Sequence, residues 1–186
     1  MNSFKSRQEF ALNPFGFPSE FVLTNYTDAW VTANIDTYFF NSVFVGLVAV
    51  LLSILTGALA AYFLSRFEFF LRNILLGFFV MGMLVPIHAT LVPMFILTQN
   101  LGINNTHLAL ILPYAAFSLP ITMFLLTSFM TSFPKEIEES AVMDGSGVLR
   151  IFWSIILPMT RPAVATAIIL NFINNWNEFS FALVLI

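Results

Sequence analysis

Long apolar runs separated by short polar segments dominate the chain after residue 40. Four runs reach about 20 residues, which is the length that an α-helix rising ~1.5 Å per residue needs to cross a bilayer core of roughly 30 Å. They cover residues 43–64, 73–98, 107–130 and 151 to the C-terminus. The pattern predicts an all-α fold, namely a polytopic membrane helix bundle with four spanning helices.

Each of the last three runs contains two prolines. Proline removes a backbone N–H and clashes within a helix, but membrane helices tolerate it where neighbouring groups satisfy the backbone. The pattern therefore predicts kinked spanning helices, and the kinks either serve packing alone or open a cavity between helices. The prolines are Pro86, Pro93, Pro113, Pro120, Pro158 and Pro162.

Composition agrees with a membrane protein and excludes several other classes. Hydrophobic residues make up 59% of the chain and charged residues 9%, against about 45–50% and about 25% in soluble domains. The net charge of −3 and the lack of a Lys/Arg cluster exclude a nucleic-acid partner. The chain contains no cysteine, which excludes disulfides, thiolate metal sites and a cysteine nucleophile.

The distribution of basic residues predicts the orientation of the helices. Loops 65–72 and 131–150 each carry two basic residues, whereas loop 99–106 carries no charge. By the positive-inside rule the first and third loops are cytoplasmic and the second is external. We therefore expect an extracytoplasmic segment over residues 1–40 and a transmembrane domain over residues 41–186. A polar external segment without a signal peptide, together with an apolar C-terminal end, predicts a chain that is truncated at both ends.

The loop at residues 131–150 has the pattern of a short surface helix followed by a tight turn. Acidic residues after Pro134 favour the positive end of a helix dipole, with Pro134 in the first turn. Ile137 and Ala141 form a small apolar stripe at i, i+4. Gly145 permits a positive φ that ends the helix, and Ser146 can cap the next one. Such a helix either docks into a groove of a soluble partner or lies on lipid.

The same loop carries a longer motif. Glu139-Ser140-Ala141, three residues, Gly145, nine residues and Ile155-x-Leu157-Pro158 resemble the EAA loop of ABC importer permeases, with serine at one alanine position. Four further segments resemble the carbohydrate-uptake type, which is similar to the second maltose-permease subunit: Asn25-Tyr26-x-x-Ala29-Trp30, Tyr38-Phe39-x-Asn41-Ser42, Ala60-Ala61-Tyr62 before Arg66-Phe67, and Trp176-Asn177-Glu178-Phe179.

The resemblance implies a permease subunit of a binding-protein-dependent importer for a sugar or oligosaccharide, in a bacterial or archaeal inner membrane. Family members usually have six spanning helices, of which this chain would hold four. The implied partners are a cytoplasmic ATPase dimer, a second permease subunit (most often a paralogue) and an extracytoplasmic solute-binding protein. The chain has no P-loop motif, so ATP would be bound by the ATPase partner and the permease itself needs no cofactor.

The resemblance also implies which residues contact the ATPase. In the docking element Glu139 would be a capping or pairing acid, and Gly145 would be required for the turn. The implied coupling residues are Glu139, Ser140, Ala141, Asp144, Gly145, Ile155, Leu157 and Pro158.

Four polar residues at helical spacing lie in the last run. Asn171, Asn174, Asn175 and Glu178 follow the spacing i, i+3, i+4, i+7, which places them on one helix face. The alternatives are hydrogen bonds between helices and a stripe along a sugar path, since amides both donate to and accept from hydroxyl groups. His88, in the second run, is expected to make a structural hydrogen bond rather than relay protons.

Two other functional classes remain as alternatives. A self-contained secondary transporter or channel would use ionisable groups inside the membrane, for which His88, Arg161 and Glu178 are the candidates. A membrane-embedded enzyme would need a cluster such as H-E-x-x-H or paired carboxylates within the spans, and the sequence contains none. We therefore expect a protein that is not an enzyme.

Overall fold

The computed structural model describes residues 1–186 and divides into two compact units, Met1–Val43 and Phe44–Ile186. The first unit contains the 3₁₀ turn η1 (Asn2–Phe4), α1 (Arg7–Leu12), α2 (Thr24–Thr32) and the start of α3 (Ile35–Arg66). Side-chain hydrogen bonds hold its short elements. The Lys5 ammonium donates to the Asn13 carbonyl at 2.7 Å, and Ser6 caps α1 by accepting from the Glu9 N–H.

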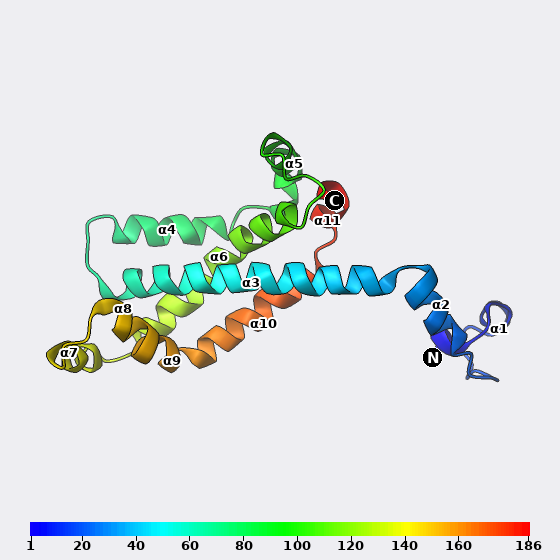
Figure 1. The fold of residues 1–186 in the computed structure, drawn as a ribbon, viewed down its shortest axis with the longest axis horizontal. Helices are drawn as coiled ribbons and strands as arrows, with labels where there is room; N and C mark the ends of the chain where they lie inside the picture. The colour runs from blue at the N-terminus through cyan, green and yellow to red at the C-terminus, as the bar shows by residue number, and fades with distance from the viewer. The chain divides into compact units, whose positions relative to one another are not determined.

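The second unit is entirely helical, which confirms the predicted fold class (Figure 1). After α3 its elements are α4 (Arg72–Gly82), η2 (Ile87–Thr90), α5 (Leu91–Asn100), α6 (Leu108–Thr131), α7 (Glu136–Met143), α8 (Val148–Ile151), the π-helical turn η3 (Phe152–Ile156), α9 (Leu157–Met159), α10 (Arg161–Asn177) and α11 (Ser180–Leu185). Helix α6 packs against α4 and α10, and α11 packs against α5.

Two of the four predicted spans are single helices and two are broken. Helices α3 and α6 are each long and apolar enough to cross a membrane, and α6 stays one helix although it contains Pro113 and Pro120. The second span bends by 93° between α4 and the segment 87–100, where Pro86 precedes η2. The fourth bends by 74° between residues 148–159 and α10, beside Pro158 and Pro162.

The last predicted span ends earlier than the sequence pattern indicates. Helix α10 stops at Asn177, and Glu178 has an extended backbone (ψ 126°) that leads into α11. The prediction that one helix runs to the C-terminus is therefore wrong. The carboxylate of Glu178 accepts the Phe181 N–H, at 2.9 Å through Oε1. An acidic side chain that caps a new helix stops the preceding one here.

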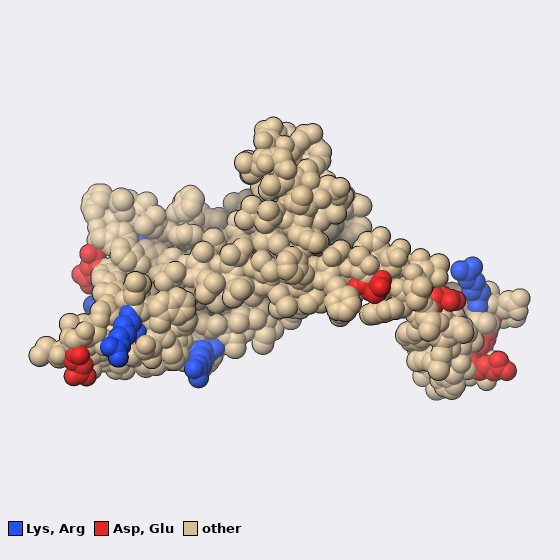
Figure 2. All heavy atoms as spheres, in the orientation of Figure 1, with Lys and Arg blue, Asp and Glu red and all other residues tan.

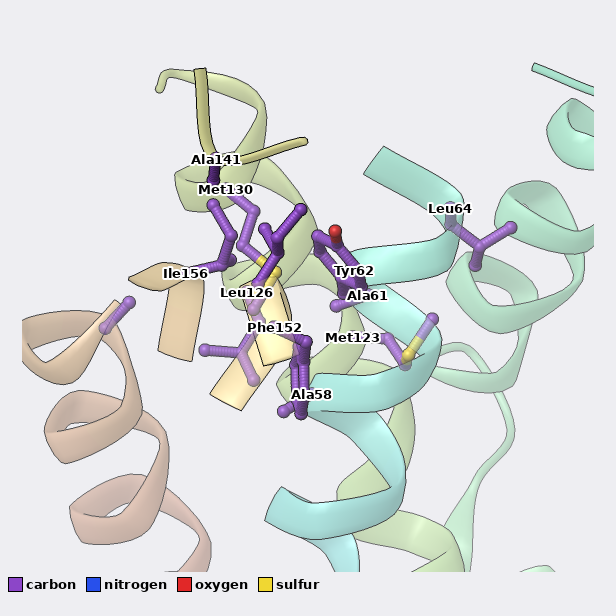
Figure 3. Close-up of a cluster of buried hydrophobic side chains, with 12 residues drawn as sticks. Ala58, Ala61, Tyr62, Leu64, Met123, Leu126, Met130, Ala141, Phe152 and Ile156 are labelled. Carbon is purple, nitrogen blue, oxygen red and sulfur yellow. The ribbon is translucent and has the colours of Figure 1, made fainter. Parts of the chain in front are cut away.

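A buried apolar cluster of the second unit combines small and large side chains from six elements, namely α3, α6, α7, α8, the π-helical turn and α10 (Figure 3). Ala58 and Ala61 of α3 allow Met123 and Leu126 of α6 to pack closely, and Phe152 of the π-helical turn completes the layer. Ala141 of α7 belongs to the same cluster. The cluster therefore ties the loop helix to the ends of three membrane segments.

The two basic loops meet at one end of the second unit. The Arg66 guanidinium donates to the Phe133 carbonyl at 3.2 Å, which joins the end of α3 to the loop before α7. Figure 2 shows charged side chains over this end, near α7 to α9, and an uncharged middle of the unit on the same face. This agrees with the prediction that loops 65–72 and 131–150 share one side of the membrane.

Candidate functional site

Helix α7 ends in a glycine turn of the predicted kind. Gly145 has φ +79°, its N–H donates to the Val142 carbonyl, and the Ser146 N–H donates to the Ala141 carbonyl, both at 2.9 Å. This pair of bonds is the Schellman arrangement that closes many helices. The expected helix stop at Gly145 is confirmed. The expected cap is wrong, because α8 has Gly147 at its N-cap and no side-chain hydrogen bond caps it.

The start of α7 also differs from the prediction. The helix begins at Glu136 with Lys135 at its N-cap, so Pro134 precedes the helix instead of lying in its first turn. Ala141 is buried and Ile137 half-buried, so the predicted apolar stripe faces the protein. The outer face of α7, as we use the term, is the exposed set Glu139, Ser140, Val142, Met143 and Asp144.

The acid that pairs within the chain is Glu138, not Glu139. The Tyr62 hydroxyl donates to Glu138 Oε2 at 2.9 Å, and Arg66 Nε forms an ion pair with Glu138 Oε1. The Arg66 side chain is 6% exposed and that of Glu138 15%. Glu139 lies one position further round the helix and is exposed. Within the chain, Glu138 is the acid that pairs, and the role of Glu139 as a capping or pairing acid of the docking element stays a prediction.

The other end of the motif lies in the membrane segment behind α7. Ile155 falls within the π-helical turn, and Leu157 and Pro158 follow it directly. The Leu157 N–H donates to the Phe152 carbonyl, the i→i+5 bond of a π-helix. Ile155 and Leu157 pack against the cluster that contains Ala141. These three residues therefore shape the support behind α7 and are absent from its outer face.

A hollow of about 530 Å³ lies between α7 and the end of α3. Its walls combine apolar side chains with charges of both signs. They are Tyr62, Arg66, Phe67, Lys135, Glu138, Glu139, Val142, Met143, Val148 and Ile151. The outer face of α7 thus borders a recess lined by both apolar and charged side chains.

The predicted polar stripe lines a second cavity of about 510 Å³. Asn171, Asn174 and Asn175 reach it from α10, and Glu178 reaches it from beyond the end of that helix. The four residues share the cavity, but they do not share one helix face as predicted. His88 also lines it, and its backbone carbonyl accepts the Leu91 N–H, but its imidazole makes no hydrogen bond within the chain, so the expected structural bond of the side chain is absent.

Asn171 is the buried end of this polar group, with 1% of its surface exposed. Its Nδ2 donates to Thr122 Oγ1 of α6 at 2.8 Å and lies 3.5 Å from Ser53 Oγ of α3. Its Oδ1 and the Nδ2 of Asn175 are buried without a hydrogen-bond partner. One buried acceptor and one buried donor of the residues that line the cavity are therefore left without a hydrogen-bond partner.

Both carboxylate oxygens of Glu178 accept hydrogen bonds from groups within the chain. Its Oε2 accepts the Tyr114 hydroxyl at 2.7 Å, and both oxygens accept the Phe181 N–H. Apart from Glu178 and His88, the cavity lining contains no acidic or basic side chain. The cavity therefore suits an uncharged polar solute better than a charged one.

Sequence patterns missed several residues of both sites. The Tyr62–Arg66 spacing of four places both side chains on one face of α3, and this spacing is the signal that could have indicated a shared partner. Tyr114, Ser53 and Thr122 lie singly among apolar residues, so no pattern marked them. Their roles depend on contacts 49 to 118 residues apart in the chain.

Three comparisons place these features among known proteins. Residues 53–186 match the family described as "Binding-protein-dependent transport system inner membrane component". The chain is 45% identical over 179 residues to the diacetylchitobiose uptake system permease protein NgcG of Streptomyces coelicolor, with 96% of this chain and 59% of that protein covered. It is 34% identical over 168 residues to the melibiose/raffinose/stachyose import permease protein MelC of Bacillus subtilis, with 90% and 61% covered.

A solved structure has the same fold. The chain superposes with a TM-score of 0.82 and 24% identity on a chain of a bacterial ABC transporter involved in the import of the acidic polysaccharide alginate, covering 100% of this chain and 65% of that one. The chain thus spans about three fifths of the length of the relatives that it matches. With the family match extending from α3 to α11, the chain belongs to the inner membrane components of binding-protein-dependent transport systems.

Proposed function

We propose that the chain is part of the permease subunit of an ATP-driven importer for a neutral sugar or oligosaccharide in a bacterial or archaeal inner membrane. Family membership and the sugar-uptake relatives support this proposal. Its partners are a cytoplasmic ATPase dimer, a second permease subunit and an extracytoplasmic solute-binding protein. In this arrangement residues 1–40 are extracytoplasmic and residues 41–186 form the membrane domain.

The outer face of α7 is the observation that carries the ATPase contact. Val142 is 57% exposed and Met143 87%, although both are apolar, and Glu139 and Asp144 lie exposed beside them. An amphipathic helix with an apolar strip and acidic flanks fits a groove that has basic edges. Residues Glu139, Ser140, Asp144 and Gly145 would contact or shape this surface. Ala141, Ile155, Leu157 and Pro158 would support it from behind.

Replacing the exposed apolar residues Val142 and Met143 with aspartate should release the ATPase. In the variant V142D/M143D, the apolar contact surface, which the ATPase would cover, carries two carboxylates. We expect at least tenfold less co-purified ATPase, which corresponds to a binding free energy weaker by about 1.4 kcal/mol, and loss of uptake. The measurement is affinity purification of the full-length permease followed by quantification of the ATPase. Leu12→Asp, at a residue of the first unit that is 88% exposed, is the control and should retain the ATPase. Normal ATPase recovery with the double variant would refute the proposed contact.

The polar cavity is the proposed segment of the solute path. Sugar hydroxyls need both donors and acceptors, which the Asn171 Oδ1 and Asn175 Nδ2 atoms provide. Asn174 and Glu178 complete the polar wall. The lining lacks basic side chains that would pair with an acidic solute. A neutral carbohydrate is therefore the solute class that this wall fits.

Replacing Asn175 with leucine should slow transport without destabilising the protein. Its Nδ2 has no partner to lose, so folding should be unaffected, while the path loses a donor worth about 1 kcal/mol or more to a passing hydroxyl. We expect about a tenfold lower uptake rate with normal basal ATP hydrolysis, measured in proteoliposomes containing the complete importer. Thr166→Val, on the same helix but away from this cavity, should transport normally. An unchanged rate for Asn175→Leu would exclude Asn175 from the path.

A further inference from the structure

We propose that Glu138, Tyr62 and Arg66 form a mechanical joint that makes α7 and the adjacent end of α3 move as one body. The inference rests on the proposed function, since it assigns these residues the task of passing the ATPase-driven displacement of α7 to the solute path. They are positioning residues, and none of them needs to touch solute or ATP. "The joint" below means these three side chains and their contacts.

The joint is the polar connection between α7 and the rest of the bundle. Tyr62 and Arg66 lie one helical turn apart on α3, and both hold the carboxylate of Glu138, one through each oxygen. Arg66 also donates to the Phe133 carbonyl at 3.2 Å, which fixes the loop that leads into α7. The hydrogen bonds and the ion pair between α7 and other helices all go to α3. The polar contacts of α7 therefore couple its displacement to α3, beside the apolar contacts that Ala141 makes in the shared cluster.

Burial makes this connection rigid. Arg66 and Glu138 are mostly withdrawn from solvent, so separating them would leave a buried charge without its partner. The Tyr62 ring packs against Phe152 and Phe67, with ring centroids 5.3 and 6.2 Å away. The phenol therefore has little freedom to follow Glu138 if α7 shifts alone. Motion of α7 together with α3 avoids these costs.

Helix α3 is suited to carry the motion onward. It is the longest helix, with 32 residues and no proline, whereas the second and fourth spans are bent at breaks that contain a proline or lie within two residues of one. Nine residues separate Tyr62 from Ser53, a length of about 14 Å along an α-helix. Ser53 Oγ lies 3.5 Å from Asn171 Nδ2, at the buried end of the polar cavity. A displacement of α3 thus reaches the wall of the proposed solute path.

The first test compares two variants with the same charge change on α7. Glu138→Gln weakens the joint, and Glu136→Gln neutralises an exposed acid on the same helix. In proteoliposomes with the full-length permease and its partners, we expect Glu138→Gln to retain the ATPase and its hydrolysis but to import at least about fivefold less solute per ATP, the lower end of typical coupling factors. Glu136→Gln should keep the normal ratio. The charge-exchanged double variant R66E/E138R should recover part of the ratio.

The second test measures the motion itself and needs no variant of the joint. Because the chain contains no cysteine, spin labels can be placed at Lys135→Cys beside α7 and Phe63→Cys on α3, both exposed positions, in a complex with cysteine-free partners. We expect the distance between the labels to be the same without nucleotide and with ATP bound. The added Glu138→Gln substitution should make that distance differ between the two states.

The results of these two tests distinguish a failure of the joint from a failure of the proposed function. An unchanged solute-to-ATP ratio in Glu138→Gln, or a label distance that changes on ATP binding in the otherwise unmodified complex, would overturn the joint while leaving the importer in place. If the unmodified complex hydrolyses ATP but imports no sugar, the proposed function fails. The two labels still decide in that case whether α7 and α3 move together.

Discussion

Replacing Gly57 with valine should destabilise the second unit by about 3 kcal/mol, at the upper end of typical overpacking costs. A Cβ atom at Gly57 would lie 2.7 Å from Thr122 Cγ2, closer than real Cβ contacts allow. Thr122 is completely buried, and its hydroxyl is held between the Ser118 carbonyl and Asn171 Nδ2. Helices α3 and α6 would have to separate or the polar network would have to break. Both would be seen as a lower melting temperature of the purified full-length protein.

The control for this prediction lies in the neighbouring helix. A Cβ atom at Gly77 of α4 would meet no atom within 4 Å. Gly77→Val therefore makes the same chemical change, with the same effect on helix propensity, and should leave the melting temperature nearly unchanged. Equal melting temperatures for the two valine variants would show that α3 and α6 do not need this close contact. A loss confined to Gly57→Val would confirm that the glycine sets the distance between them.

The fold could be predicted from sequence where a single physical requirement dominates. Crossing a bilayer demands about 20 apolar residues, so the long runs predict both ends of α6 and the end of α3 within a few residues, while α3 begins eight residues, slightly more than two turns, before the predicted run. The bends could not be predicted in the same way. Pro113 and Pro120 leave α6 unbroken, whereas Pro86 lies at a sharp turn. Whether a proline breaks a membrane helix depends on what satisfies the freed carbonyl groups, and those partners are distant in sequence.

In the candidate sites, too, features set by residues close in sequence could be predicted, whereas features set by distant contacts could not. Gly145 was predictable because a positive φ strongly favours glycine, and the turn forms from residues within one loop. The choice between Glu138 and Glu139 was not, because it depends on which side of α7 faces Tyr62 and Arg66, more than 65 residues away in the chain. Glu178 was misplaced for a related reason. Its spacing fits a helix face, but capping α11 and accepting from Tyr114 satisfy the carboxylate better.

Removing the charge of Arg66 while keeping Glu138 should weaken the contact between α7 and the bundle more than the other substitutions in the joint. In Arg66→Met the apolar part of the side chain is kept, but the Glu138 carboxylate is left buried with the Tyr62 hydroxyl as its remaining partner. Breaking a buried ion pair in this way costs about 3–5 kcal/mol. Glu138 can escape that cost by carrying α7 away from the bundle into water. The cost should therefore appear as local opening of α7 rather than as global unfolding.

Hydrogen exchange can distinguish this local opening from a general loss of stability. About 3 kcal/mol of lost attachment corresponds to roughly a hundredfold faster exchange of amides over residues 136–143 in Arg66→Met, with α6 amides unchanged. The double variant R66M/E138Q should return most of that protection, because a neutral amide can still accept from Tyr62 and no buried charge remains. Arg150→Met, at an exposed arginine, should leave exchange in α7 unaltered. If α7 exchanged as slowly in Arg66→Met as in the unmodified protein, apolar packing of Ala141, and not the charge pair, would hold α7 in place.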